Sequence, residues 1–223
     1  MLKLAVTCLV MTLCGLPAAA GSVDGQQTYD LLFRNGTLDD IDQGEDLIYR
    51  RDVFNALNPD AAKRDTGDIV LSFEQGDAAM AHLKFWQGDR QRSLGVFPAS
   101  VGNPMIMVFY ESVVRDMAES AGGSPFYIRN RVKESLIRPT EVEQGTAVID
   151  GQTVQTQIIR LHPFLNDPNI GRMRGFGTLE MRVTMSDAVP GWYISLVAEA
   201  SQAEDQKPVY RSEMRFDRVE QTQ

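Results

Sequence analysis

The chain has 223 residues, of which 43% are hydrophobic and 23% are charged. This length is sufficient for a domain that buries most of its apolar surface without disulfide bonds. Thirty acidic residues against 22 basic ones give a formal net charge of −8. Such an acidic balance argues against general binding to nucleic acid or to anionic membrane surfaces.

The first twenty residues are typical of a signal peptide. Lys3 is their only charge, and residues 4–16 are apolar apart from Thr7, Thr12 and Gly15. A membrane span needs roughly 20 apolar residues, so this run is too short, and the small residues 18–20 suit a signal peptidase. We expect cleavage after Ala20, a periplasmic location and no stable membrane insertion afterwards. Secretion and an uncleaved anchor are the alternatives. Both cysteines, Cys8 and Cys14, lie in this segment.

Residues 29–97 are predicted to form strands joined by short turns. Asn35-Gly36 is a strong hairpin signal, because both residue types tolerate a positive φ, and it joins predicted strands 29–34 and 37–41. Turns at 75–77 and 87–89 separate three further strands at 69–74, 79–86 and 91–97. Residues 55–66 are expected to be the most mobile loop. The acidic run 39–46 lacks the glycine and glutamate positions of a calcium loop and is interpreted as a solvated turn.

A helical pair is predicted between residues 103 and 138. Asn103 supplies an N-cap and Pro104 a first helical residue, and Gly122-Gly123 ends this helix. A second helix starts at Ser124-Pro125 and ends before Pro139. The apolar stripes contain Ile106, Phe109, Tyr110, Val113 and Met117 in the first helix, and Ile128, Val132 and Leu136 in the second. The dry face of the sheet is the large apolar surface against which these stripes can be buried.

Strand patterns resume after the helices. Asp150-Gly151 joins predicted strands 146–149 and 152–161, and residues 178–199 form a predicted hairpin with its turn at Pro190-Gly191. A further strand contains Tyr210, Met214 and Phe216 and follows a polar loop. The predicted fold class is mainly β (α+β). It is a twisted antiparallel meander or half-open barrel of roughly nine strands, in a single domain over residues 21–223 with the helical insertion at about 103–138.

A long antiparallel meander with an inserted helical pair, following an export signal, resembles the half-open barrel of periplasmic lipoprotein carriers of the LolA/LolB type. The resemblance is one of compartment, size and order of elements, and it covers most of the mature chain. It implies that the helices cover a sheet that holds acyl chains, with an apolar cavity and no catalysis.

No familiar catalytic or metal-binding motif occurs in the sequence. His82 and His162 are the two histidines and stand far apart in the chain, whereas a metal site needs three or four converging ligands. No nucleophile elbow, zinc-protease, P-loop or dinucleotide-binding motif is present. We therefore predict neither a metal nor a cofactor. The sequence does not exclude a pair of carboxylates of the kind that glycosidases use, so an unrecognised hydrolase stays among the hypotheses.

The helical pair contains the candidate ligand-binding residues. Arg129, Arg131, Lys133 and Arg138 form a dense basic cluster, which is either a solvated face or a contact for a phosphate, a lipid headgroup or an acidic partner. The candidate site consists of Phe109, Val113, Met117, Ile128, Val132, Arg129 and Lys133. We expect a carrier or binding module for an apolar small molecule, such as a lipid or a lipoprotein acyl chain. The alternative is a structural or interaction protein of the envelope, with the helical pair as its docking surface.

Overall fold

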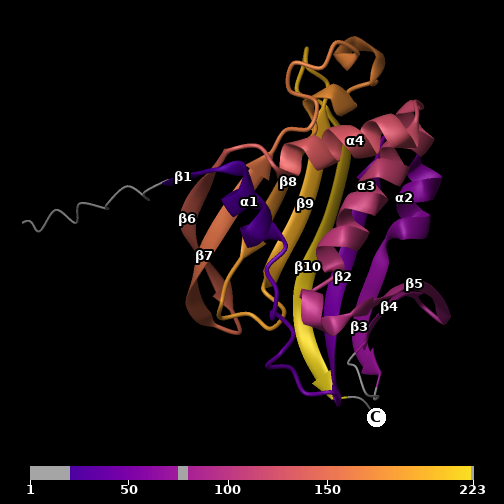
Figure 1. Ribbon diagram of the computed structural model, residues 1–223. Coiled ribbons are helices and arrows are strands. Elements are labelled where there is room, and N and C mark those ends of the chain that lie inside the picture. The colour runs from indigo at the N-terminus through magenta and orange to yellow at the C-terminus, as the bar shows by residue number, and fades with distance from the viewer. Residues whose placement is uncertain (1–20, 75–79, 222–223) are drawn as a thin grey trace, which may run out of the picture.

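One curved, open antiparallel sheet forms the frame of the protein (Figure 1). The computed structural model describes residues 21–74 and 80–221. Within these residues, ten strands follow the order β1-β6-β7-β8-β9-β10-β2-β3-β4-β5 and are accompanied by four α-helices. The predicted mainly β fold with an inserted helical pair is confirmed, and the sheet is not closed into a barrel. The strands are β1 (Gly21–Val23), β2 (Glu45–Asn55), β3 (Gly67–Glu74), β4 (Met80–Gln87), β5 (Arg90–Pro98), β6 (Thr140–Ile149), β7 (Gln152–Leu161), β8 (Glu180–Met185), β9 (Tyr193–Ser201) and β10 (Pro208–Gln221).

The sheet consists of two meanders that meet at its centre. Strands β2 to β5 form one meander and β6 to β10 the other, and the two are joined by the pairing of β10 with β2. This pairing is long and runs from Tyr210 opposite Asn55 to Gln221 opposite Glu45, with one bulge between Phe216 and Arg218. Two strands that are far apart in the sequence, β2 and β10, therefore lie side by side in the middle of the sheet, whereas β1 lies at its edge.

Most of the predicted strands are confirmed. Their signals, side-chain alternation and turn residues, lie within the strands themselves or directly beside them. The hairpin of β6 and β7 turns at Asp150 and Gly151, which both have positive φ angles of 49° and 77°, as the tight hairpin turns require. The alternating pattern of residues 178–185 becomes β8, in which every second side chain is buried. The predicted turn at 75–77 lies outside the described residues.

Helices α3 (Met105–Ala121) and α4 (Pro125–Leu136) are the predicted pair and lie across one face of the sheet (Figure 1). The side-chain oxygen of Asn103 accepts a hydrogen bond from the backbone N–H of Met105 at 3.0 Å. Its amide nitrogen donates to the carbonyl of Gly191 at 2.8 Å. Asn103 therefore binds the N–H of the first helical residue and fixes the start of the helix to the β8–β9 turn, although the N-cap itself is Pro104, one residue later than predicted. At the other end, Gly122 has a φ of 79° and ends α3, as predicted.

Two segments near the N-terminus contradict the sequence predictions. Residues 29–34 were predicted as a strand of a hairpin, but α1 (Gly25–Leu32) is a helix, started by a capping box between Asp24 and Gln27. Residues 37–41 form turns instead of the second strand. Residues 55–66 were predicted as a loop but include α2 (Pro59–Asp65), where the Asn58 side chain caps the N–H of Ala61. In both helices, side-chain caps satisfy backbone N–H groups locally, and this outweighs the weak periodicity.

A network of buried ion pairs attaches α2 and α3 to the sheet. Arg51 of β2 and Asp116 of α3 are 2% and 3% exposed, and their side chains meet at 3.0 Å. The Tyr210 hydroxyl donates a second hydrogen bond to Asp116 at 2.9 Å. Asp65, at the end of α2, is 1% exposed and forms ion pairs with three arginines, namely Arg64, Arg92 and Arg115. Each buried carboxylate is thus compensated by arginine, as burial of charge requires.

Asp65 makes the stability of the fold dependent on pH in the acid range. Burial by itself raises the pKa of this carboxyl, but the Arg64 hydrogen bond and the nearby arginine charges outweigh burial and lower the pKa overall. A carboxyl whose pKa is lowered by folding stabilises the protein above its unfolded pKa of about 3.9. That contribution is lost as the pH falls through the lower folded value.

We therefore expect Asp65→Asn to be less stable than the wild type at neutral pH and to lose less stability on acidification. The measurement is the free energy of unfolding in urea at several pH values from neutral to below 3.9, with the exposed loop variant Asp205→Asn as the control. Parallel profiles of unfolding free energy against pH for the wild type and Asp65→Asn would contradict the conclusion that Asp65 contributes to the pH dependence of stability.

Candidate functional site: an apolar groove between the helices

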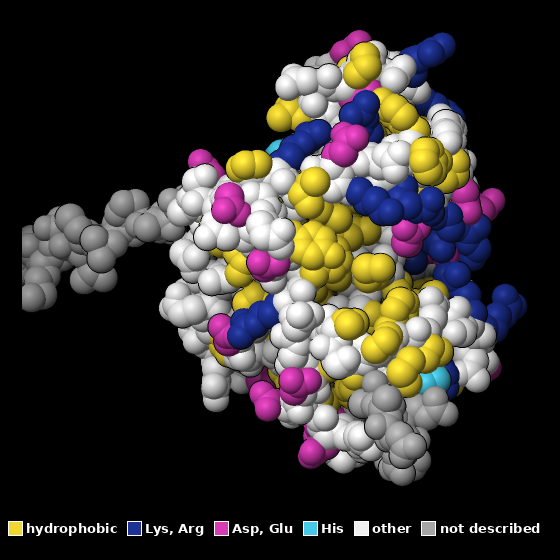
Figure 2. Space-filling view, in the orientation of Figure 1, with side chains coloured by type: hydrophobic (Ala, Val, Ile, Leu, Met, Phe, Trp, Pro, Cys, Tyr) yellow, Lys and Arg dark blue, Asp and Glu magenta, His cyan; other side chains and the backbone are white. Residues whose placement is uncertain are grey.

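The helices enclose an open apolar groove, which we call the helix groove. It lies between α1, α3 and α4 and has a volume of about 400 Å³, within the range of small-molecule pockets, roughly 300–1,000 Å³. Figure 2 shows hydrophobic side chains gathered at this position, with Lys and Arg along one edge. The lining residues are Tyr29, Phe33, Met107, Tyr110, Glu111, Val114, Arg129, Val132, Lys133, Leu136 and Ile137.

Helix α1 supplies an aromatic wall. Tyr29 and Phe33 are four residues apart at the end of α1, and their rings stack with centroids 4.6 Å apart. Phe33 also contacts the ring of Tyr110 on α3 at 6.2 Å. The wall stands close to α4 because Gly25 has no side chain: a Cβ atom there would lie 1.9 Å from the carbonyl oxygen of Ile137.

Helices α3 and α4 supply an aliphatic wall that is only partly covered. Met107 is 48% exposed and Ile137 is 62% exposed, although both are large apolar residues. Tyr110 is buried, and its hydroxyl has no hydrogen-bond partner among the described residues. Burial raises the pKa of Tyr110 well above its ordinary value, so the side chain stays neutral. Apolar surface left open beside a groove is typical of binding sites.

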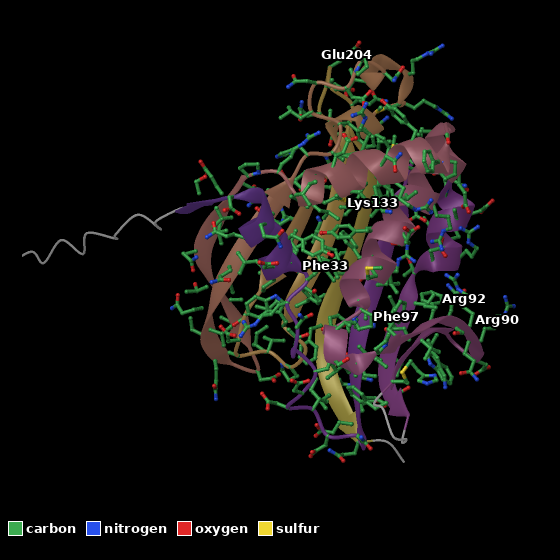
Figure 3. The ribbon with its side chains drawn as sticks, in the orientation of Figure 1. Phe33, Arg90, Arg92, Phe97, Lys133 and Glu204 are labelled. Atoms are coloured by element: carbon green, nitrogen blue, oxygen red, sulfur yellow. The ribbon has the colours of Figure 1, made fainter. Side chains whose placement is uncertain are left out.

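Among the described residues that line the groove, the charged ones, Glu111, Arg129 and Lys133, all lie on the α3–α4 edge. Arg129 forms a two-pronged ion pair with Glu111, with distances of 2.8 Å from Nε to Oε1 and 2.7 Å from Nη2 to Oε2. The pair raises the pKa of Arg129 and lowers that of Glu111, so both remain charged at neutral pH. Lys133 forms no ion pair with any residue that the structure describes. Its charge contributes to lowering the pKa of Glu111, but its ammonium group is left without an ion pair of its own among the described residues at this edge (Figure 3).

The rest of the predicted basic cluster is neutralised by carboxylates away from the groove. Arg131 pairs with Glu134 at 2.8 Å and with the buried Asp167 at 3.1 Å. Arg138 lies 3.7 Å from Glu134. The charges of Arg131 and Arg138 are thus balanced by nearby carboxylates, whereas Arg129 and Lys133 belong to the groove edge.

A second hollow continues the helix groove toward β5. It has a volume of about 300 Å³ and shares Tyr29, Phe33 and Met107 with the groove. Its further lining includes Phe97 at the end of β5 and Val101, which is 57% exposed. Figure 3 labels Phe33 on α1 and Phe97 on β5. The second hollow also has polar and charged lining residues, namely Asp30, Arg34, Asn35 and Asn103, so it is less apolar than the helix groove.

The predicted site residues fall into three groups. Arg129, Val132 and Lys133 line the helix groove. Met117 and Ile128 line a different hollow, of about 450 Å³, between the end of α3 and the loop that carries Asn169. The structure places Phe109 and Val113 in the core, both 0% exposed.

Sequence reasoning missed the α1 side of the groove. Tyr29 and Phe33 were assigned to a strand. The prediction therefore gave no helix at this position that could face α3 and α4. The signal that could have found them is the capping box at Asp24 and Gln27, followed by two aromatics at a spacing of four. Met107 and Ile137 were missed because they lie beside the apolar stripes and not within them.

Other kinds of site find less support in the described part of the chain. Residues 21–74 and 80–221 contain no group of three or more His, Cys, Asp or Glu side chains arranged to hold a metal ion. His162 lies 4.0 Å from Glu180, near the limit for an ion pair. None of the described helices is both long enough and apolar enough to cross a bilayer.

Comparison with known proteins does not assign the chain to a family. No family model matches its sequence, and no curated protein matches it.

Proposed function

We propose that the protein binds an apolar or amphipathic small molecule, such as a lipid acyl chain, in the helix groove and acts as a carrier or binding module. The observation that carries this proposal is a hollow of about 400 Å³ whose walls are aromatic and aliphatic and whose flanks, at Met107 and Ile137, remain exposed. An apolar ligand that covers such surface removes it from water, and the free energy gained is roughly 25 cal/mol per Å² of apolar surface buried.

The charged edge favours an amphipathic ligand over a purely apolar one. Arg129 and Glu111 compensate each other, whereas Lys133 offers an ammonium group at the edge of an apolar surface. A ligand with an apolar tail and an anionic head would cover the walls and pair with Lys133. The proposed role in the periplasm depends on the separate prediction that residues 1–20 are an export signal.

A charge placed on the groove wall should prevent this binding. We expect Met107→Glu to weaken the binding of a neutral apolar fluorophore, N-phenyl-1-naphthylamine, by about tenfold or more, because the ligand would have to desolvate a carboxylate. The position is exposed, so the free energy of unfolding should change by only about 0.5 kcal/mol. The measurement is a fluorescence titration alongside urea denaturation.

The matched control is Val148→Glu, which places the same charge on an exposed apolar residue of β6 that does not line the groove. Its probe affinity should equal that of the wild type. Equal loss of affinity in both variants, or no probe binding by the wild type, would refute the proposed function. Native mass spectrometry of protein purified from its own host would then identify a carried ligand by its added mass.

A further inference from the structure

Another hollow, separate from the helix groove, has a lining rich in arginine. This arginine pocket has a volume of about 270 Å³ and is lined by Arg64, Phe85, Gln87, Arg90, Gln91 and Arg92. It shares no lining residue with the helix groove. In Figure 3, Arg90 and Arg92 lie together on β5, and Figure 2 shows a concentration of Lys and Arg on this side of the molecule. Such a concentration is unexpected in a chain with a net charge of −8.

The carboxylates around the pocket do not balance its arginines. Arg64 and Arg92 both pair with Asp65, and Arg64 also pairs with Glu119. Asp65 is shared further with Arg115, whose other partner, Asp116, is already paired with Arg51. Arg90 has no ion-pair partner within the part of the chain that the structure describes. These ion pairs join four arginines, two of which line the pocket, to three carboxylates, and Arg90 lines the pocket outside this network.

This excess of positive charge affects Arg92 directly. Its pKa is lowered, first by burial and then by the charges of Arg115, Arg51 and Arg64, although Asp65 acts in the opposite direction. Bringing an anion into the pocket would relieve that repulsion. The neighbouring arginines thus create a local positive potential that a ligand of opposite charge can neutralise.

Two donors of the pocket, Arg92 and Gln87, are held in place, whereas Arg90 and Gln91 are exposed. The guanidinium of Arg92 lies over the ring of the buried Phe85, with its carbon 4.7 Å from the ring centroid, while Asp65 holds one of its nitrogens at 2.9 Å. The Gln87 amide donates to the carbonyl oxygens of Lys63 and Thr66, at 2.6 and 2.8 Å, and so ties β4 to α2. Side chains fixed in this way lose little conformational freedom when a ligand binds.

We propose that the arginine pocket binds a phosphate group. The planar fork of a guanidinium matches the oxygens of phosphate, and two or more arginines around a hollow of this size provide several such donors. Arg90 is the principal ligand, because it lines the pocket without a carboxylate partner among the described residues. Gln91, next to it, adds an exposed amide. The phosphate can belong to a free small anion or to a lipid headgroup, and both offer the same oxygens.

The first test uses inorganic phosphate as the probe. Isothermal titration of the wild type in low-salt buffer should show saturable binding, and Arg90→Gln should weaken it by about tenfold or more, the effect of losing a charge-assisted contact. Gln91→Glu, which places a negative charge at the pocket, should weaken it similarly. The control Lys207→Gln removes a charge from the β9–β10 loop and should leave binding unchanged. Equal urea midpoints for the four proteins establish that folding is intact.

The second test distinguishes the two sources of phosphate. In a flotation assay, binding to phosphatidylcholine vesicles that contain phosphatidic acid, with loss of that binding in Arg90→Gln, identifies a lipid headgroup. Phosphate binding in the titration without flotation identifies a free anion. Absence of both, or binding that survives Arg90→Gln and Gln91→Glu, overturns the proposal. Because the Met107→Glu experiment concerns the helix groove, failure of one proposal leaves the other intact.

Discussion

Replacing Asp116 with alanine is expected to lower the free energy of unfolding by about 3–5 kcal/mol, because it leaves the Arg51 guanidinium buried without a carboxylate. Arg51 is 2% exposed, and Asp116 is its ion-pair partner at 3.0 Å. The Nε of Arg51 already has no hydrogen-bond partner among the described residues. The Tyr210 hydroxyl would lose its acceptor as well. Urea denaturation at neutral pH, with the m-value compared, measures this loss.

Two further variants show whether the loss comes from the uncompensated charge. Glu119→Ala removes a half-exposed carboxylate from the same helix and should cost only about 0–1 kcal/mol. The double variant Arg51→Met with Asp116→Leu removes both buried charges and should recover much of the lost stability. A cost below about 1 kcal/mol for Asp116→Ala would contradict the assignment, because it would mean that Arg51 finds water or another partner.

Truncating Phe109 to alanine is expected to cost about 3–5 kcal/mol, the usual price of a cavity in a packed core. The ring is 0% exposed and lies 5.5 Å from the ring of Tyr110. Since Phe109 is not among the residues that line the helix groove, the affinity of the folded protein for N-phenyl-1-naphthylamine should remain within about twofold of the wild-type value. The two measurements are the urea midpoint and the probe titration on the same protein.

Met107→Ala is the counterpart of this variant, since Met107 is half-exposed and lines the groove. It should lower probe affinity with little change in stability. If Phe109→Ala instead lowered probe affinity at small cost in stability, Phe109 would contact the ligand. The sequence-based hypothesis that it belongs to the binding site would then be supported against our interpretation of it as core.

The sequence was a good guide to most of the strands and to the helical pair, whereas the Asn35-Gly36 signal was misleading and the caps of α1 and α2 were overlooked. The alternation of residues 178–185 predicted β8, Asp150-Gly151 predicted the hairpin of β6 and β7, and the signals at Asn103 and Gly122 predicted the limits of α3 to within one residue. Each depends on side-chain alternation or on the backbone preference of one or two residues. Such preferences act before distant parts of the chain meet.

The candidate site was only partly predictable for the same reason. Arg129, Val132 and Lys133 share one helix, and helical spacing alone brings them to a common edge. Tyr29 and Phe33 face these residues only because α1 packs against the end of α4, which is more than a hundred residues away in the sequence. The contact depends on the close approach at Gly25 and on a hydrogen bond from the Thr28 hydroxyl to the carbonyl of Arg138 at 3.2 Å.

By itself, then, the sequence determined an antiparallel β protein with a helical pair, and it named three residues of that pair, Arg129, Val132 and Lys133, that line the helix groove. Only the tertiary structure decided that β2 lies at the centre of the sheet. Its Arg51 is a charged residue at a buried position and interrupts the apolar pattern expected of a buried strand. In the fold Asp116 pairs with Arg51, and the Tyr210 hydroxyl donates to Asp116. A buried charge is tolerated only when oppositely charged or hydrogen-bonding groups surround it. For Arg51, the tertiary fold brings that group from a distant segment of the chain.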